Sequence, residues 1–333
     1  SLTNSNIGRA KSFFEKFRNR TVLGLLRFLF LLSVFILVWR VFDGEEAIRL
    51  LFDANPLLLL AGFISLSLQT VLAAFRWRLT ASQLGLAISA KTALGEYYLS
   101  QIANQSLPGG VLGDAGRVVR SSSQAGWVIS AKAVFIEKMT GQVMLFVLFF
   151  ITLSLGLISP TNVSFPSWLL NTSLLVLAIT ILLVLLVTGF IRIRKSKLAS
   201  MLSDFSGDVY KSLLAKNVRW PQLGLTLGAS IFNIFGFIFA AWAIGAEITV
   251  GIAFILVPII LLAMLIPLTI GGWGIREATA AALFPIAGAG QSEGLASSVA
   301  FGLLFLLVSL PGVLVALSRR QTPPNSNDQG VVR

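Results

Sequence analysis

Long runs of apolar residues alternate along the chain with short clusters of charged residues. Six runs are long enough to cross a bilayer, whose hydrocarbon core of about 30 Å needs roughly 20 helical residues. They cover residues 21–42, 56–75, 139–158, 168–191, 221–244 and 294–317. Tryptophans stand near several of their ends, as expected for the aromatic belt at a membrane surface. The pattern predicts an all-α integral membrane protein with about six full spans.

The charged clusters between these runs predict the topology. Basic residues gather after the second run, around 117–132, between 192 and 219 and after the last run, whereas residues 43–55 are mainly acidic. Because basic loops stay in the cytoplasm, residues 92–112 must enter from the cytoplasmic side and return to it. Glu96 agrees with this, since a carboxylate at the centre of a spanning helix costs about 2.5–3.5 kcal/mol. We expect a re-entrant hairpin over about residues 92–125.

A second ambiguous segment, residues 250–271, is uncharged and long enough to span. As a full span it would place Arg319 and Arg320 outside, whereas a hairpin entering from the outside keeps both in the cytoplasm. Pro258 and Pro267 interrupt the segment, and the residues after Arg276 can form a returning arm. We expect a second re-entrant hairpin over about residues 250–290.

This topology divides the chain into three parts. A basic cytoplasmic N-terminus (1–20) precedes a single transmembrane unit (21–318), and a polar cytoplasmic tail (319–333) follows it. The first run is longer than the apolar core of a signal peptide, so we expect it to be retained as a span. We expect a multi-pass protein of a bacterial or archaeal cytoplasmic membrane.

The two halves of the predicted unit have the same elements in opposite orientation. Each consists of a span, a hairpin and a span, and the first hairpin enters from the inside whereas the second enters from the outside. The tips are loosely alike, with Pro108-Gly109-Gly110 and Arg117 in the first and Pro267, Gly271-Gly272 and Arg276 in the second. Inverted repeats with Gly- and Pro-interrupted helices are typical of transporters. The sequence thus suggests an inverted-topology repeat.

The first tip carries the most informative candidate site. Gly109, Gly110 and Gly113 allow sharp turns and close approach of a ligand to the backbone. A helix starting near Asp114 would direct free N–H groups at an anionic headgroup, and Arg117 would add charge-assisted contacts to a phosphate. The alternative is that Asp114 only caps this helix and Arg117 only extends toward the membrane surface.

Other polar residues near the spans have similar pairs of interpretations. Arg276 and Glu277, at the second tip with Gly271 and Gly272, form a mutually neutralising pair or contact a headgroup. Glu137 opens the third span, and pairing with Arg117 explains it as well as a functional role does. Arg76 closes the second span either as a snorkelling cation or as a lipid-phosphate contact. Three amides in spans, Gln69, Gln142 and Asn233, line a polar path or bond between helices.

The composition narrows the chemistry. Only 12% of residues are charged, about half of the roughly 25% usual in soluble domains. The chain has no Cys and no His, which removes thiol chemistry, imidazole zinc sites and Ser-His nucleophiles. Carboxylate chemistry and a carboxylate-bound metal remain open, but we expect no enzyme active site, no metal and no cofactor. The net charge of +12 lies in loops beside the spans, where it sets topology and meets anionic lipids rather than nucleic acid.

These residues resemble the lysyl-phosphatidylglycerol synthase transmembrane family of flippase-like membrane proteins. The resemblance rests on Arg76-Trp77, on Leu107–Asp114 (LPGGVLGD) with Arg117, on Glu137, and on Gly271–Glu277 (GGWGIRE). The family usually has Gly-Gly-Asp where this chain has Leu112-Gly113-Asp114, and Glu-Arg where it has Glu137-Lys138. The resemblance implies lipid handling. Full-length relatives add a soluble aminoacyl-transfer domain, which has no counterpart after Leu317, so lipid aminoacylation is not expected of this chain.

The leading hypothesis is a flippase for a phospholipid or a polyprenyl-phosphate-linked lipid. Arg117 and Arg276, one near each face, would hold the phosphate in turn, while Asp114, Glu137 and Glu277 would orient them or accept a headgroup amine. Two alternatives remain open: a secondary transporter of a soluble anion, and a non-transporting membrane partner of a lipid-modifying glycosyltransferase. The expected partners are anionic, aminoacyl or polyprenyl-phosphate membrane lipids.

Overall fold

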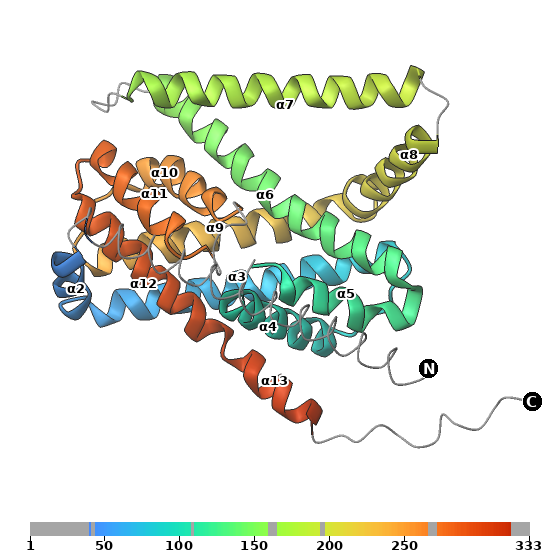
Figure 1. The fold of residues 1–333 in the computed structure, drawn as a ribbon, viewed down its shortest axis with the longest axis horizontal. Helices are drawn as coiled ribbons and strands as arrows, with labels where there is room; N and C mark the ends of the chain where they lie inside the picture. Colours follow the sequence, from blue (N-terminus) through green and yellow to red (C-terminus); the bar gives the residue numbers. More distant parts are fainter. Residues whose placement is uncertain are drawn as a thin grey trace, which may run out of the picture.

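The computed structural model describes residues 40, 44–107, 110–158, 165–193, 197–265 and 272–320, and every regular element in these ranges is helical (Figure 1). The elements in order are α2 (Gly44–Phe52), α3 (Pro56–Gln83), α4 (Ala90–Ser106), α5 (Leu112–Ala125), α6 (Trp127–Ile158), α7 (Ser167–Ile193), α8 (Lys197–Val209), the π-helix η1 (Tyr210–Leu214), α9 (Arg219–Ala243), α10 (Val250–Ala263), α11 (Ile275–Leu283), the 3₁₀-helix η2 (Phe284–Ala287), α12 (Gln291–Ser309) and α13 (Pro311–Arg320). The predicted N-terminus lies outside the described residues, as do nearly all of the first span and the polar tail.

Five helical segments in the described ranges are long and apolar enough to cross a membrane: Pro56–Gln83, Trp127–Ile158, Ser167–Phe190, Arg219–Ala243 and Gln291–Ser318. They coincide with the second to sixth predicted spans, so the prediction of an all-α membrane protein is confirmed. Helix α3 extends beyond the C-terminal end of its predicted span, and α6 begins before the N-terminal end of its span. In both helices the additional residues include polar side chains that pack against polar neighbours. Hydropathy marks only the apolar part of such a helix.

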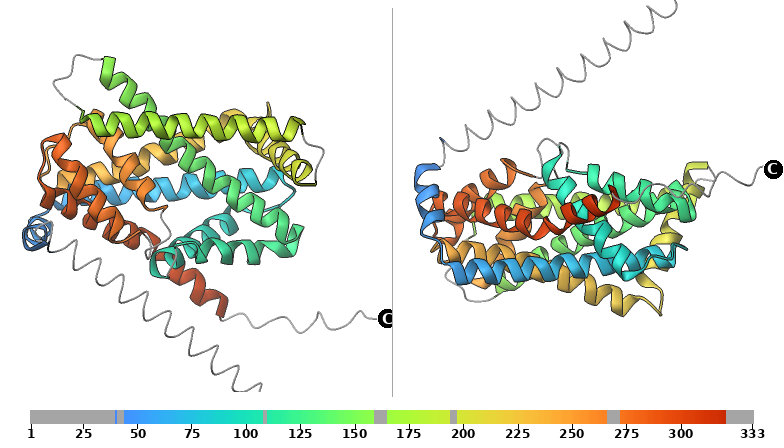
Figure 2. Two further views of the ribbon diagram at one scale, coloured as in Figure 1. Left: turned by 45° about the horizontal axis from the view of Figure 1, so that its top comes forward. Right: turned by 90° about the horizontal axis from the view of Figure 1, so that it is seen from below.

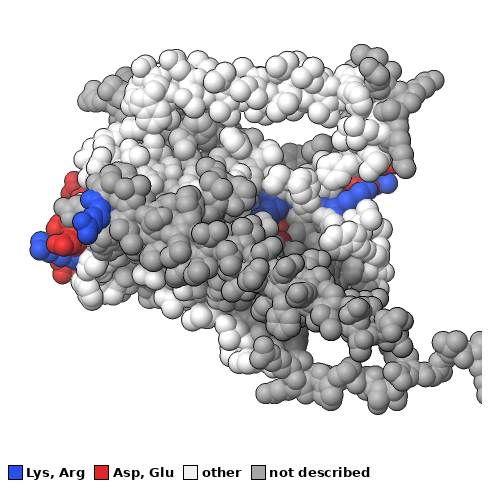
Figure 3. Space-filling model, in the orientation of Figure 1, with Lys and Arg blue, Asp and Glu red and all other residues white. Residues whose placement is uncertain are grey.

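The helices run mostly along the long axis of the molecule (Figures 1 and 2). On the face drawn in Figure 3, charged atoms of the described residues lie at one end, near α2, and in recessed patches in the middle. Helix α7 runs along one edge with only 6% of its apolar window buried. An apolar surface of this extent is suited to lipid rather than to water.

Helices α3 and α9 pack against each other at the centre in antiparallel orientation. Ser65 Oγ donates to the carbonyl oxygen of Phe232 at 2.8 Å, and Gln222 Nε2 donates to Thr80 Oγ1 at 2.9 Å, so residues early in α3 meet residues late in α9. The helices approach closely at Gly236, where an added Cβ would lie 2.5 Å from Leu66 Cδ2. A small residue at this crossing lets the two backbones approach.

Both predicted hairpins are pairs of short helices that turn back on themselves. Within the first, Arg120 Nε of α5 donates to Glu96 Oε2 of α4 at 2.6 Å, and Gly113 N donates to Asn104 Oδ1 at 2.8 Å. These contacts join the ends of the two helices in antiparallel order. In the second hairpin, α10 packs on α11. An added Cβ on Gly272 would lie 2.7 Å from Met264 in the connection.

The turns that lead into the two hairpins are built alike. Gly85 after α3 and Gly245 after α9 both have φ of +91°, a conformation that favours glycine. Four residues later, Ser89 caps α4 and Thr249 caps α10, each accepting a hydrogen bond from the backbone three residues on. Packing between the halves is also reciprocal, because α6 contacts α10 while α12 and α13 contact α4.

Candidate functional site

A cavity of about 290 Å³ lies where the two hairpin tips meet the long helices. Gly110 and Val111 line it from the first tip, and Met264, Leu265 and Gly272 line it from the second. Side chains of α3, α4, α5, α6, α9 and α12 complete the wall. In Figure 1 the first hairpin lies toward one end of the long axis and the second toward the other. The cavity is therefore central and contacts both halves of the chain.

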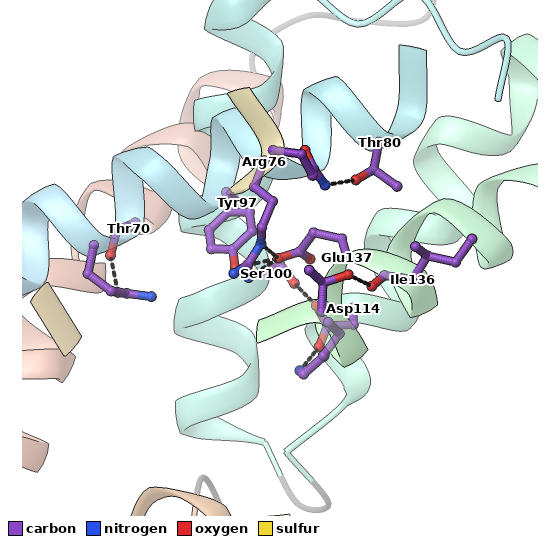
Figure 4. A network of polar contacts seen from close by, with 12 residues as sticks. Thr70, Arg76, Thr80, Tyr97, Ser100, Asp114, Ile136 and Glu137 are labelled. Carbon is purple, nitrogen blue, oxygen red and sulfur yellow. Dashed lines mark hydrogen bonds and ion pairs between the residues drawn. The ribbon is translucent and has the colours of Figure 1, made fainter. Parts of the chain in front are cut away.

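Glu137 of α6 is the centre of a buried charge network on the cavity wall. Its Oε1 accepts from Arg76 Nη2 at 2.6 Å and from Tyr97 Oη at 3.3 Å, and its Oε2 accepts from Arg117 Nη2 at 3.2 Å. Figure 4 shows Arg76, Tyr97 and Glu137 converging from three helices. The expected pairing of Glu137 with Arg117 is confirmed. Arg76 is also buried and paired, so it does not extend to the membrane surface.

Asp114 holds the first hairpin together from inside. Its Oδ1 accepts from Ser100 Oγ and Arg117 Nη2, each at 3.0 Å, and its Oδ2 accepts from Asn104 Nδ2 at 2.9 Å and from Lys138 Nζ. The N-cap of α5 is Val111, which makes no side-chain cap hydrogen bond. The interpretation of Asp114 as only a helix cap is therefore wrong: its carboxylate bonds to side chains across the hairpin.

Arg117 lies between two aromatic rings. Its guanidinium carbon is 4.7 Å from the centre of the Trp77 ring and 4.9 Å from that of Tyr97, distances at which a cation and a ring attract. The side chain is only 1% exposed, so the alternative of a snorkelling arginine is wrong. Its Nε and Nη1 have no protein hydrogen-bond partner. Two strong donors thus remain unused on a cation that lines the cavity.

Neutral amides form another part of the wall. Gln69, Gln142 and Asn233 line the cavity as one of their two interpretations predicted, and Gln101 and Gln105 of α4 lie beside them. Four of these five side chains have a buried polar atom without a protein partner: Gln101 Nε2, Gln105 Oε1, Gln142 Oε1 and Asn233 Oδ1. Buried polar groups usually have partners. This cluster of unpaired atoms makes the cavity the candidate binding site.

The sequence analysis missed Tyr97, Gln101, Gln105 and Lys138 as parts of this site. A signal existed for three of them, because residues 97, 101 and 105 are four apart and share one face of a helix. In a segment between apolar spans, such a polar stripe indicates a polar surface to be covered. The only sequence signal for Lys138 was that the family usually has Arg at this position, after Glu137.

Arg276 and Glu277, which follow the second tip, form a buried ion pair. Arg276 Nη2 lies 2.6 Å from Glu277 Oε1, both side chains are 0% exposed, and Arg276 Nε also donates to Ser298 Oγ at 2.9 Å. Glu277 Oε2 accepts from Gly274 N at 2.6 Å, and the Arg276 guanidinium stacks on Trp273. The predicted neutralising pair is confirmed. Neither residue lines the cavity, and the headgroup contact by Arg276 stays a prediction.

The predicted tip glycines have different surroundings. Gly110 and Gly272 line the cavity with φ of +61° and +83°, where other residues are strained. Gly113 does not line it: an added Cβ would lie 2.0 Å from the Ser100 carbonyl oxygen, so this glycine lets α5 pack against α4. Gly109 and Gly271 lie outside the described residues.

The acidic side chains do not suggest a metal site. Within the described parts of the chain, no three His, Cys, Asp or Glu side chains are close enough together to bind a metal ion. The two carboxylates of the network are instead surrounded by Arg76, Arg117 and Lys138.

Comparison with known proteins gives one match. The family model for the lysylphosphatidylglycerol synthase TM region matches residues 24–312, which include both hairpins, the charge network and the cavity. No curated protein and no solved structure matches the chain.

Proposed function

Because the chain belongs to the lysylphosphatidylglycerol synthase transmembrane family, we propose that it moves a lipid headgroup across the cytoplasmic membrane through the central cavity. The observation that carries the proposal is the position of the cavity. A set of charged residues and unpaired amides is enclosed by helices whose outer surfaces are apolar. A headgroup bound there is solvated by the protein while its acyl chains stay in the bilayer.

The distribution of charge supports a membrane topology with both termini in the cytoplasm. Arg78 and Lys91 flank the loop after α3, and the segment around α8 and η1 is basic, whereas α2 begins with Glu45 and Glu46. Basic loops face the cytoplasm. In this topology the α4–α5 hairpin enters from the cytoplasm and the α10–α11 hairpin from the outside. Helices α4 and α10 have 17 and 14 residues, or about 25 and 21 Å, short of the roughly 30 Å of a hydrocarbon core.

The two halves then form an inverted-topology repeat. Three features support this: the antiparallel packing of α3 on α9, the matching turns at Gly85 and Gly245, and the reciprocal packing of each half's hairpin on the other half. Transporters with such repeats bind substrate near the midplane between the repeats and expose it alternately to the two sides. Rocking of one half against the other would open the same cavity first inward and then outward.

In this mechanism the charge network binds rather than reacts. Arg117 supplies a cation with two unpaired donors for a phosphate, and Trp77 and Tyr97 hold its guanidinium plane. Glu137 and Asp114 keep Arg117 in place while Arg76 and Lys138 balance their charge. We propose transport rather than catalysis because each of these ionisable groups already has an ion-pair partner.

Reconstitution tests the proposal. Purified protein in liposomes should accelerate the transbilayer movement of a fluorescent anionic phospholipid, measured as the fraction quenched by an impermeant reductant, relative to protein-free liposomes. Accumulation of a soluble anion inside vesicles without lipid movement would favour the soluble-anion transporter. Absence of both activities in correctly folded protein would contradict transport and favour the role of a membrane partner of a lipid-modifying enzyme.

A further inference from the structure

The cavity's charges and amides also specify the headgroup. Resting on the proposed function, we infer that the cavity binds a phosphate ester whose headgroup is rich in hydroxyls and carries no cationic amine. A phosphoinositol or phosphoglycerol group has this chemistry. A lysyl-bearing headgroup lacks it, because its ammonium groups leave the headgroup with net positive charge.

The first argument is the balance of charge. Three cations line the described cavity wall, Arg76, Arg117 and Lys138, against two carboxylates, Asp114 and Glu137. The segments next to the two tips that the structure does not describe, residues 108–109 and 266–271, contain no ionisable residue in the sequence. A wall with one excess positive charge attracts a phosphate and repels a cationic headgroup, and the low dielectric around it strengthens both effects.

The second argument is that every carboxylate oxygen of the network is already bonded to the protein. Glu137 Oε1 accepts from Arg76 and Tyr97, and its Oε2 accepts from Arg117. Asp114 accepts two hydrogen bonds on each oxygen, including one from Lys138 on Oδ2. An ammonium group entering the cavity would have to compete with these cations for carboxylate oxygens that are already bonded. The unused groups of the charged wall are instead the donors Nε and Nη1 of Arg117, which suit an anion.

The third argument is the set of neutral amides in the cavity wall. The unpaired atoms are one donor, Gln101 Nε2, and three acceptors, Gln105 Oε1, Gln142 Oε1 and Asn233 Oδ1, and they come from three helices. A hydroxyl group both donates and accepts, so a polyol can satisfy donors and acceptors together. A quaternary ammonium headgroup has no N–H or O–H to donate and would leave the acceptors unpaired.

The size and the apolar part of the cavity define the rest of the ligand. A volume of about 290 Å³ is at the lower end of the roughly 300–1,000 Å³ of ligand pockets. It suits a phosphate with one compact polyol rather than an oligosaccharide. Apolar residues of the second half, Leu261, Met264, Leu265, Phe301 and Phe305, line the remaining wall. They are suited to the first carbons of a lipid tail.

Calorimetric titration of the purified full chain in detergent tests the inference without requiring transport. The ligands are dihexanoyl lipids of equal chain length with phosphoinositol, phosphoglycerol, phosphocholine, lysyl-phosphoglycerol or bare phosphate headgroups. We expect the phosphoinositol lipid to bind at least about tenfold more tightly than the phosphocholine and lysyl lipids, a factor that corresponds to roughly 1.4 kcal/mol. Equal affinity for all headgroups, tighter binding of the lysyl lipid, or no binding at all would overturn the inference.

A pair of variants separates the contribution of the amides from general packing. Gln101→Leu removes an amide that lines the cavity, whereas Gln222→Leu removes a buried amide that bonds Thr80 elsewhere between α3 and α9. Gln101→Leu should weaken phosphoinositol binding about three- to tenfold, as expected for one hydrogen bond, and leave the bare-phosphate lipid unchanged. Gln222→Leu should change neither affinity. Equal effects of the two variants on phosphoinositol binding would contradict a hydroxyl-reading role.

Two further arms separate this inference from the proposed function. Free inositol phosphate should bind more weakly than the matching lipid. Equal affinity would contradict the claim that the ligand is a lipid rather than a soluble phosphate ester. In liposomes, selective movement of phosphoinositol lipid over lysyl lipid supports both proposals. Movement of all headgroups at one rate would support transport and overturn the selectivity. Selective binding without movement in liposomes would support the selectivity and overturn transport.

Discussion

Arg117 Nη2 of the first hairpin lies 3.2 Å from Glu137 Oε2 of α6, and both side chains are 1% exposed. This ion pair fixes the hairpin to a helix that crosses the membrane. It also uses only one nitrogen of the guanidinium and leaves the other two without a protein partner. The same contact therefore stabilises the hairpin and holds a cation in the cavity wall.

Removing the charge of Glu137 should destabilise the protein strongly. Glu137→Gln leaves Arg76 and Arg117 buried with less compensation, and breaking a buried ion pair costs about 3–5 kcal/mol. Glu96→Gln is the control, because its partner Arg120 is 33% exposed and can be solvated. We expect a clearly lower thermal midpoint in detergent for Glu137→Gln than for Glu96→Gln. Equal midpoints for the two variants would contradict a structural role for the network.

The first hairpin should not tolerate a side chain at Gly113. A Cβ there would lie 2.0 Å from the Ser100 carbonyl oxygen, so Gly113→Ala must push α5 away from α4. Overpacking of this kind costs about 1–3 kcal/mol, and the shift should also weaken lipid binding by displacing Asp114. Gly224→Ala is the control, since nothing lies within 4 Å of its added Cβ. Thermal unfolding and lipid titration of both variants check this, and wild-type behaviour of Gly113→Ala would disprove the close packing.

The second tip should matter for stability but not for headgroup selection. Glu277→Gln keeps an oxygen for the Gly274 N–H but leaves Arg276 as a buried charge without its counterion. We expect a loss of stability of about 3–5 kcal/mol and an unchanged ratio of affinities for the phosphoinositol and phosphocholine lipids. A changed ratio in the folded variant would instead favour the headgroup contact by Arg276 that the sequence analysis offered as an alternative.

Single cysteines can test the re-entrant topology because the chain has no native Cys. Ala87, Gln124 and Ser203 are exposed, and a cysteine placed at any of these positions should react with an impermeant maleimide from the cytoplasmic side. Asp53, Glu247 and Gln291 are also exposed, and a cysteine at any of these positions should react only from the outside. Labelling of Ala87→Cys and Gln124→Cys from opposite sides would make the first hairpin a full span and remove the inverted repeat.

The sequence predicted the helical class and five of the spans well because lipid imposes a simple rule on spanning helices. Short helices do occur in pairs at both predicted hairpin segments, while their re-entrant topology stays a prediction. The position of the buried charge network around Glu137 could be predicted less directly from the sequence. Arg117 and Glu137 are twenty residues apart, and only their pairing in space shows that Arg117 is buried rather than snorkelling.

The limits of sequence reasoning are clearest at the second tip. Arg117 and Arg276 occupy comparable places in the sequence motifs, yet one lines the cavity and the other is enclosed by Glu277, Ser298 and Trp273. The difference comes from tertiary packing: Gly302 of α12 faces Arg276 so closely that an added Cβ would lie 2.2 Å from its Nη2. No local pattern around residue 276 reveals a neighbour so far along the chain.

The most direct test of lipid movement through this cavity compares Arg117→Gln with Arg120→Gln in the same liposomes. Both variants lose one positive charge from α5, but only Arg117 lines the cavity. Arg117→Lys serves as a further variant that keeps the charge while removing the guanidinium. The account predicts that Arg117→Gln and Arg117→Lys slow the transbilayer movement of an anionic phospholipid at least about tenfold, as for a lost hydrogen bond to a charged group. Arg120→Gln should stay near the wild-type rate. A wild-type rate in folded Arg117→Gln and Arg117→Lys would contradict the central claim.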